Sequence, residues 1–254
     1  MKSPIIVVGI GEIGSVIARA FLRIGYTVVP VTREMNMEQV SINTQEPEAV
    51  VIAVGEADLQ TTLKQVPSAW KSKLILIQNE LLPRDWEIHN INPTVISVWF
   101  EKKKGQDVKV VVPSPVFGEK AELLSTALDA LDIPTTQLNT SEQLTFELVR
   151  KNYYILTSNI AGLKTGGTVG DLWEQNKEFA SAVVDDVHEL QQSLVQQELD
   201  KKRLIDAMLV AFKGDPDHGC MGRSAPARLK RAIEIADQNS LEVPTLREIQ
   251  NSMG

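Results

Sequence analysis

The chain has 254 residues, of which 43% are hydrophobic and 23% charged, and its formal net charge is −7. This composition indicates a globular protein that buries a sizeable core in one large domain or two smaller ones. The negative charge disfavours nucleic acid and anionic lipid as partners, while a local basic pocket for a small anion is compatible with it.

The use of cysteine and the hydropathy pattern bear on compartment. Cys220 is the single cysteine, so no intramolecular disulfide can form, as is usual in a reducing compartment. Cys220 and His218 form a lone pair without zinc spacing, and we expect no metal. An apolar strand begins almost at Met1, which leaves no room for a signal peptide, and no apolar run approaches the roughly 18 residues of a membrane span. We therefore expect a cytoplasmic protein without a membrane partner.

The first thirty residues have the pattern of a strand, a helix and a second strand. Residues 5–8 form a continuous apolar run, typical of a strand that is buried on both faces. Apolar residues then recur at helical spacing over 13–24, Gly25 is a natural helix stop, and residues 26–31 are again apolar.

Three glycines between the first strand and the helix fit the pattern G-x-G-x-x-G. One glycine permits a tight turn, one lets a pyrophosphate approach the backbone, and one lets the helix pack closely with its N-terminus aimed at the phosphates. The pattern predicts a dinucleotide site, and the alternatives are a plain glycine turn or a site that has lost its ligand. The residues of the predicted turn are Gly9, Ile10, Gly11, Glu12, Ile13 and Gly14.

The residues after the second strand indicate which dinucleotide binds. An NAD site usually has an acid there, which accepts hydrogen bonds from the ribose hydroxyls. Thr32 and Arg33 offer a hydroxyl and a cation, which suit a 2′-phosphate and predict NADP(H). In the alternative interpretation Arg33 is a solvated loop residue, and Glu34 weakens the case for a phosphate.

The rest of the first half continues as alternating strands and helices, which predicts a doubly wound, Rossmann-type α/β sheet. Pro30 is poorly tolerated in a central strand, so we infer that the strand usually found beyond this one is reduced or missing. We expect strands at 49–54 and 73–79, helices at 56–66 and 119–131, an antiparallel extension at 95–100 and 108–114, and a solvated lysine-rich hairpin turn at 102–104.

From Thr140 the pattern becomes helical, and Thr140 with Gln143 can form a capping box. We expect a dinucleotide-binding domain at 1–139 and a helical domain for substrate binding or dimerisation at 140–254. The expected helices are 141–163, 177–200 and 225–241.

Lys151 and Asn159 are unusual in an otherwise apolar helix. They are eight residues apart, about 12 Å along the axis on nearly the same face. If this helix lines a cleft beside a nicotinamide, Lys151 can protonate a carbonyl oxygen as hydride arrives at carbon, and Asn159 can hold a polar group of the substrate. The alternative is a surface-reaching lysine and an asparagine that bonds between helices.

Over most of its length the chain resembles the ketopantoate reductase family, NADPH-dependent 2-oxoacid reductases with a Rossmann domain and a helical C-terminal domain. The resemblance implies that Arg33 selects NADPH, that Asn79 lies near nicotinamide and substrate, that Lys151 is the catalytic lysine, and that Asn159 is the helix motif's second asparagine. The segments that carry it are "GIGEIG", "VTR", "LILIQNELL", "RKNYYILTSNIAGL", "VGDLW" and "ADQNSLEVPTLREI".

The sequence also departs from the family's pattern. Ile155 replaces the first asparagine of the helix motif, Glu80 replaces a glycine, and Gly55 stands where the family has a lysine. Pro226 lies near the expected glutamate. The segment "PDHGCMGRSAP" is a candidate replacement pocket in which His218, Arg223 and Ser224 could bind a carboxylate or phosphate; the alternative is an ordinary polar loop. Cys220 is not expected to be a nucleophile.

Three hypotheses follow from these residues. The first is an NADPH-dependent reductase of a small 2-oxo or related carbonyl compound. The second is a relative of the 3-hydroxyacid dehydrogenases, which Ile155 disfavours because those enzymes pair the lysine with an asparagine four residues on. The third is a catalytically reduced NADP(H)-binding protein that senses cofactor or regulates a partner. A helical second domain also favours a homodimer.

Overall fold

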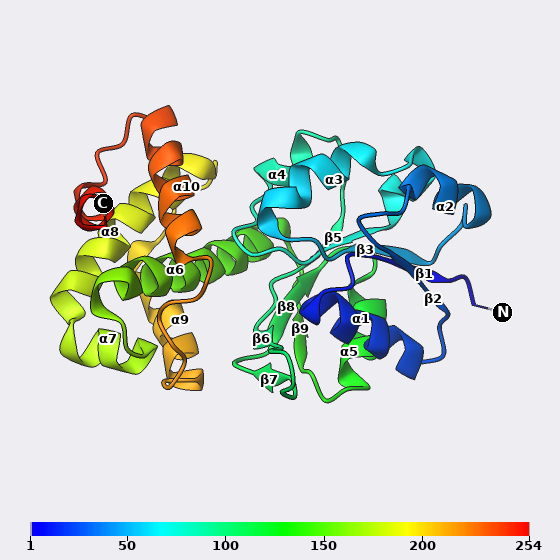
Figure 1. Cartoon of the computed structure of the whole chain (residues 1–254), viewed down its shortest axis with the longest axis horizontal. Coiled ribbons are helices and arrows are strands. Elements are labelled where there is room, and N and C mark those ends of the chain that lie inside the picture. Colours follow the sequence, from blue (N-terminus) through cyan, green and yellow to red (C-terminus); the bar gives the residue numbers. More distant parts are fainter. Residues whose placement is uncertain (1, 254) are drawn as a thin grey trace. The chain divides into compact units, whose positions relative to one another are not determined.

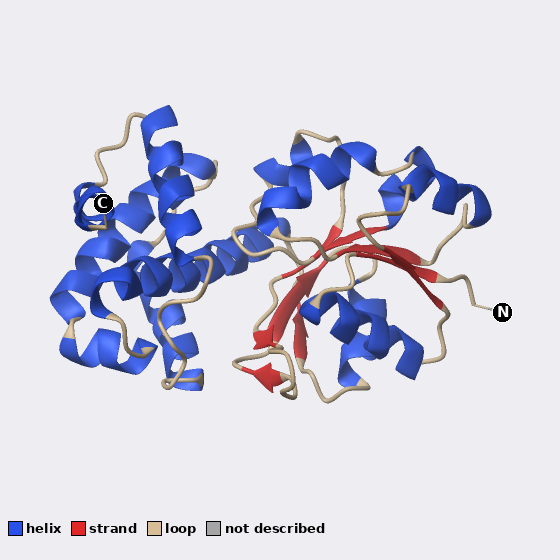
Figure 2. Ribbon diagram, viewed as in Figure 1, coloured by secondary structure: helices blue, strands red, loops and turns tan. Residues whose placement is uncertain are grey.

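The computed structural model describes residues 2–253, and the chain forms two compact units, Met1–Glu147 and Leu148–Gly254. The first unit is an α/β domain and the second is helical (Figure 2). Helix α6, Ser141–Thr165, begins in the first unit and continues into the second.

The first unit is built on a sheet of seven strands in the order β2-β1-β3-β4-β5-β8-β9. Neighbouring strands are parallel except for β5 and β8, which are antiparallel, and the predicted doubly wound α/β sheet is confirmed. The strands are β1 Ile5–Val8, β2 Val28–Val31, β3 Ala49–Ile52, β4 Leu74–Leu76, β5 Thr94–Ile96, β8 Ser114–Phe117 and β9 Thr135–Gln137.

Strand β2 is an edge of this sheet, which accounts for Pro30. The proline lies opposite Val7 of β1 on one side, and no described strand pairs with β2 on the other. An edge strand tolerates a residue without an N–H group. The link to β3 contains only the short helix α2, Met37–Asn43, so the prediction of a missing strand is confirmed.

The segment 95–100 differs from the expected antiparallel extension. Strand β5 pairs in parallel with β4, and it is antiparallel only to β8. The chain then forms a separate antiparallel hairpin of β6, Phe100–Glu101, and β7, Lys109–Val110, whose connection holds the three lysines at 102–104. All three residues of β5 are buried, as is usual for a parallel strand in the core of a sheet. Because the strand is so short, the sequence pattern did not distinguish this arrangement from an antiparallel one.

Helices cover both faces of the sheet (Figure 1). Helix α1, Glu12–Arg23, and helix α5, Ala121–Asp129, pack together on one face. The other face carries α2, α3 and α4. Their apolar sides bury the sheet in a continuous core. The helical elements on this second face include the 3-10 helices η1 Glu56–Asp58 and η2 Ser68–Lys73, and α3 Leu59–Gln65 and α4 Arg84–Glu87.

The second unit consists of helices around α6. The start of α6 agrees with the predicted capping signal, because Thr140 Oγ1 accepts from the Gln143 N–H at 3.3 Å, although the Gln143 side chain accepts from Asn139 N instead of Thr140 N. None of the described helices is long and apolar enough to cross a membrane. The remaining helices are α7 Val169–Gln175, α8 Lys177–Leu194, α9 Lys201–Gly214, α10 Ala225–Gln238 and α11 Pro244–Ser252.

Helix α8 is shorter than predicted, and α9 was not predicted. The side chain of Gln192 accepts from Leu199 N at 2.9 Å and donates to the carbonyl of Gln197, which closes a loop after α8. Asp200 then caps α9 by accepting from Arg203 N at 3.0 Å. The sequence 195–200 contains good helix formers, so propensity alone did not show this break.

Candidate functional site

The three glycines after β1 have different steric surroundings. Gly9 has φ +92°, and a Cβ there would lie 2.8 Å from the carbonyl oxygen of Ala53. A Cβ on Gly14 would lie 2.0 Å from the carbonyl oxygen of Gly9, whereas one on Gly11 would meet nothing within 4 Å. Gly9 and Gly14 are therefore required by the turn and by helix packing, while Gly11 leaves its backbone open to a ligand.

The N-terminus of α1 has the features of an anion site. Gly11 is the N-cap residue and has no side chain to bond the first N–H groups, and the helix begins with the bond from Ser15 N to Gly11 O at 2.9 Å. With twelve residues, α1 is long enough to present a positive end of its dipole. Glu12 and Ile13, which belong to the predicted turn, lie with Gly14 in the first turn of α1.

A cavity of about 770 Å³ lies at the carboxyl ends of β1, β2 and β3. This volume is within the range usual for small-molecule sites, and the carboxyl edge of a doubly wound sheet is where such sites form. Of the predicted cofactor residues, the structure brings together Gly9, Ile10, Gly11, Thr32 and Arg33 as part of its wall.

Sequence reasoning missed the wall of this cavity that follows β3. Asp58 at the end of η1 and three polar residues of α3, Thr61, Thr62 and Gln65, line it. Gly55 also lines the cavity, and a Cβ on it would meet nothing within 4 Å. The available signal was the cluster of polar residues after the third strand, at the same edge as the glycine turn.

Arg33 has a specific partner at this cavity. Its side chain is 90% exposed, and its Nη2 lies 3.0 Å from Oδ2 of Asp58, whose side chain is 52% exposed. The two residues come from different elements, the loop after β2 and η1. Glu34 lines the same cavity.

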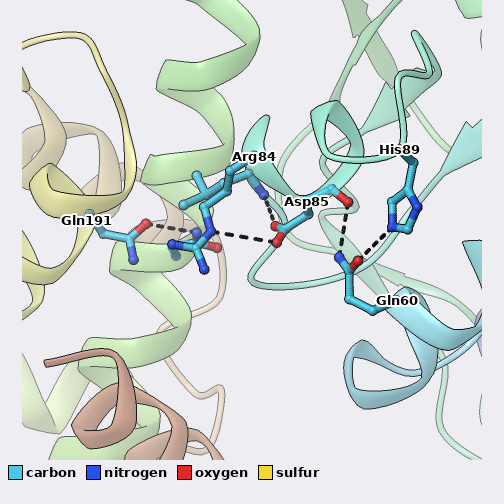
Figure 3. A network of polar contacts seen from close by, with 7 residues as sticks. Gln60, Arg84, Asp85, His89 and Gln191 are labelled. Carbon is cyan, nitrogen blue, oxygen red and sulfur yellow. Dashed lines mark hydrogen bonds and ion pairs between the residues drawn. The ribbon is translucent and has the colours of Figure 1, made fainter. Parts of the chain in front are cut away.

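Helix α3 is held in place by a polar network with α4 (Figure 3). Gln60 Nε2 donates to the carbonyl of Asp85 at 3.0 Å, and Gln60 Oε1 lies 2.8 Å from His89 Nε2. The carboxylate of Asp85 accepts from Leu82 N at 2.8 Å, and burial raises the pKa of this carboxyl, with the Leu82 N–H and Arg84 opposing the shift. The network fixes the helix that presents the missed polar wall.

Asn79 lies three residues beyond β4 and is half-buried, and it is not among the residues that line the cavity. The preceding Gln78 is buried and ties the end of β4 to β3 by donating to the carbonyls of Ile52 and Val54. Glu80, which replaces a glycine of the resembled family, has φ +59°. The chain therefore retains the left-handed turn that favours glycine there.

Lys151 is half-buried on α6, and its Nζ lies 5.9 Å from the ring centroid of Tyr154, within cation–π distance. The Tyr154 ring packs edge-on against Phe212 of α9 at 5.4 Å. Ile155, one turn after Lys151, is buried. The ammonium group is thus placed over an aromatic face of the second unit.

Asn159 is buried and has both ends of its amide engaged. Its Nδ2 donates to the carbonyl of Cys220 at 3.0 Å and to Ser158 Oγ at 3.3 Å, and its Oδ1 accepts from Arg228 Nη1 at 2.6 Å. Arg228 on α10 is 8% exposed. Sequence reasoning missed this buried cation, although it lies close to Pro226, where the resemblance led us to expect a glutamate.

The three candidate residues of the segment before α10, which are His218, Arg223 and Ser224, differ in their contacts and exposure. His218 Nδ1 lies 3.6 Å from Asp215 Oδ2, and its ring packs 6.1 Å from that of Tyr154. Arg223 and Ser224 are exposed near the start of α10. Cys220 is buried, and burial raises the pKa of its thiol to about 11, which agrees with the expectation that it is not a nucleophile.

The chain has an α/β unit with a glycine turn at the start of its first helix, followed by a helical unit. Comparison with solved structures shows that this is the fold of the ketopantoate reductases. Neither a protein-family model nor a curated protein matches the sequence.

Among the similar structures is 2-dehydropantoate 2-reductase from Methylococcus capsulatus, with a TM-score of 0.64, 14% identity, and coverage of 98% of this chain and 95% of that one. A dimeric ketopantoate reductase from Staphylococcus aureus has a TM-score of 0.67, 15% identity and coverage of 97% and 96%. D-mandelate dehydrogenase, solved with NADH, has a TM-score of 0.64, 13% identity and coverage of 99% and 97%.

Proposed function

We propose that the protein is an NADPH-dependent reductase of a small 2-oxoacid or related carbonyl compound, a divergent relative of the ketopantoate reductases. The observation that carries the proposal is the glycine turn, in which Gly11 alone is sterically open, at a cavity of about 770 Å³ on the carboxyl edge of the sheet. The shared fold and the NADH-bound neighbour support it.

The residues of the first unit fit a dinucleotide. The backbone of Gly9 to Gly11 and the uncapped start of α1 would hold the pyrophosphate, and Thr32 with Arg33 would hold a 2′-phosphate. When bound, the nicotinamide supplies a hydride to the carbonyl carbon of the substrate. Gly14 contributes by letting α1 approach β1.

In this proposal Lys151 protonates or stabilises the carbonyl oxygen of the substrate. The Nζ of Lys151 lies 5.9 Å from the centroid of the Tyr154 ring, and this contact restricts the lysine side chain. Asn79 would orient the substrate.

The hydrogen bonds of Asn159 support a positioning role for it in this proposal. Because its oxygen accepts from Arg228 and its nitrogen donates to the Cys220 carbonyl, the amide orients the guanidinium. A guanidinium offers five donors in a fork that matches a carboxylate. We propose that Arg228 binds the carboxylate of the 2-oxoacid, which replaces the direct substrate contact expected of Asn159.

The test is the oxidation of NADPH by the purified protein against a panel of 2-oxoacids that includes ketopantoate. Turnover by the native chain that falls at least about a hundredfold in Lys151→Ala is the expected result, since a general acid typically contributes that much or more. Lys164→Ala is the matched control, because Lys164 lies on the same helix in an exposed ion pair with Glu248. Equal turnover in Lys151→Ala would contradict the role of this lysine.

Specific observations favour a second candidate, an NADP(H)-binding sensor or regulator without turnover. Gly55 leaves the cavity without the lysine of the resembled family, Ile155 is apolar, and Asn159 is committed to bonds within the second unit. Binding of NADPH without oxidation by any carbonyl acid would select this candidate.

Light scattering across a concentration range tests the accompanying proposal of a homodimer, which the dimeric structural neighbour supports.

A further inference from the structure

The charged residues that line the cavity are unfavourably balanced for a 2′-phosphate. They are one cation, Arg33, and two acids, Glu34 and Asp58. A 2′-phosphate brings about two negative charges, and it competes with the carboxylate of Asp58 for the guanidinium of Arg33. The position that carries a lysine in the resembled family is Gly55, so no second cation stands in this part of the wall.

The ion pair between Arg33 and Asp58 makes the charge balance still less favourable for a 2′-phosphate. Nη2 of Arg33 lies 3.0 Å from Oδ2 of Asp58, so the guanidinium is directed at a carboxylate on the opposite wall. A 2′-phosphate must take Arg33 from this carboxylate or bind beside it. Since both side chains are solvent-exposed, the ion pair is weak and is replaceable by a ligand.

Asp58 also supplies a carboxylate to this cavity, in addition to Glu34 of the loop after β2. NAD sites use a carboxylate to accept hydrogen bonds from the adenosine ribose, usually at the end of the second strand. Here Thr32 and Arg33 occupy that place and Glu34 follows them, whereas the carboxylate that pairs with Arg33 comes from η1, after β3, into the same cavity. One wall therefore offers a cation for a phosphate, and the facing wall offers an acceptor for hydroxyl groups.

We propose that Asp58 determines the choice of dinucleotide: it draws Arg33 away from a 2′-phosphate and accepts hydrogen bonds from the ribose hydroxyls, so that the cavity takes NADH as well as NADPH. The inference rests on the proposed dinucleotide site, and it adds a specificity residue that neither the resemblance nor the glycine turn indicates.

The experiment measures the dissociation constants of NADH and NADPH by reduced-nicotinamide fluorescence for the native chain and for Asp58→Asn, at one fixed ionic strength. We expect the variant to bind NADPH about threefold to fivefold more tightly and NADH correspondingly more weakly, so that the NADPH:NADH preference rises about tenfold to twenty-fivefold. Glu38→Gln is the matched control, since it removes an exposed acid of neighbouring α2 that does not line the cavity. Its preference should equal that of the native chain.

A further variant separates the effect of Asp58 on Arg33 from a general change of charge. In Arg33→Ala, adding Asp58→Asn should no longer tighten NADPH, because the guanidinium that Asp58 restrains is gone. If both dinucleotides bind the native chain and Asp58→Asn leaves their ratio unchanged, the specificity role is overturned while the dinucleotide site stands. If neither binds, the proposed function itself fails, and the two failures are thus distinct.

Discussion

At the scale of single residues, the two buried asparagines of α6 show how hydrogen-bond partners decide what a side chain can do. Asn159 accepts from the guanidinium of Arg228, whereas Asn152 donates to the side-chain oxygen of Gln191 at 2.9 Å. Both asparagines are nearly inaccessible to solvent. A negative charge at position 159 has a cationic partner, Arg228, whereas at position 152 the bonded side chain, Gln191, is neutral.

This difference predicts opposite results for one substitution. Asn159→Asp removes the donor to the Cys220 carbonyl, but it keeps an acceptor beside Arg228 and adds a counter-charge that offsets this loss, so the fold should be retained while the guanidinium becomes less available to a substrate carboxylate. We expect KM for 2-oxoacids to rise at least about tenfold with a smaller change in kcat, equivalent to roughly 1.4 kcal/mol of binding. Steady-state kinetics and urea denaturation of the variant measure the two effects.

The matched comparison is Asn152→Asp, which buries a charge beside the neutral Gln191. This variant should lose about 2–4 kcal/mol of unfolding free energy, because a buried carboxylate without a counter-charge is strongly unfavourable. An unchanged KM in a folded Asn159→Asp protein would show that Arg228 is purely structural and would contradict its proposed contact with the carboxylate.

Such roles could be only partly predicted from the sequence. Spacing placed Gly9, Gly11 and Gly14 at the start of the first helix, and for Gly9 and Gly14 glycine is dictated locally by φ and by close packing. The partners of Arg33 and Asn159 are 25 and 69 residues away along the chain, so no local pattern announces them. Polar partners of this kind become visible only when tertiary packing brings separate elements together.

At the scale of elements, helix α11 depends on a cap that comes from another helix. Its N-cap residue, Val243, has φ +40° and no side-chain acceptor. Asp186 of α8 supplies one, since its buried carboxylate accepts from Leu246 N at 2.9 Å and also bonds the backbone of Thr245. Burial raises the pKa of Asp186, and nearby acids raise it further. The two backbone hydrogen bonds oppose this increase. The carboxyl group of Asp186 thus fixes the start of α11.

Substitutions of Asp186 should separate the hydrogen bond from the charge. Asp186→Ala removes the acceptor, and we expect it to lose about 1–2 kcal/mol of unfolding free energy, as for other helix caps. Asp186→Asn keeps an acceptor and should lose less. Urea denaturation at neutral pH measures both, and equal stability of the alanine variant and the native chain would contradict the capping role.

The raised pKa also fixes the sign of the pH dependence. Between the ordinary carboxyl pKa and the raised one, the folded chain holds a proton that the unfolded chain has lost, so this group stabilises the fold more as the pH falls. The native chain should therefore gain unfolding free energy relative to Asp186→Asn on going down through the raised pKa, and the gain should level off below the ordinary pKa. The opposite slope would show that the pKa is lowered instead.

Elements with a strong period were predictable, and those set by side-chain partners were not. Strand β1 and helix α1 follow from apolar spacing and the stop at Gly25, and helix α10 begins where its spacing predicts but ends at Gln238, before the expected residue 241. The break between α8 and α9 comes from the bonds of Gln192 to Leu199 and Gln197, which override the helix propensity of the intervening residues. The parallel pairing of β5 likewise depends on the neighbour it meets and not on its own sequence.

At the scale of the whole molecule, the dinucleotide should stabilise the folded chain by mass action, because the cavity exists only when β1, β2 and β3 are assembled. A ligand at a hundred times its dissociation constant adds about 2.7 kcal/mol. For a chain of this size each kcal/mol shifts the melting temperature by about 2–4 °C. We expect NADPH at that excess to raise the melting temperature by about 5–10 °C.

Two glycine variants make this thermal shift diagnostic of the site. A methyl group on Gly11 meets nothing within 4 Å and lies in the cavity wall, so Gly11→Ala should melt close to the native chain without ligand and lose most of the NADPH shift. A methyl group on Gly14 would be 2.0 Å from Gly9 O, so Gly14→Ala should already melt lower without ligand. If Gly11→Ala keeps the full shift, the pyrophosphate does not bind at this turn, and the dinucleotide site must be sought elsewhere in the chain.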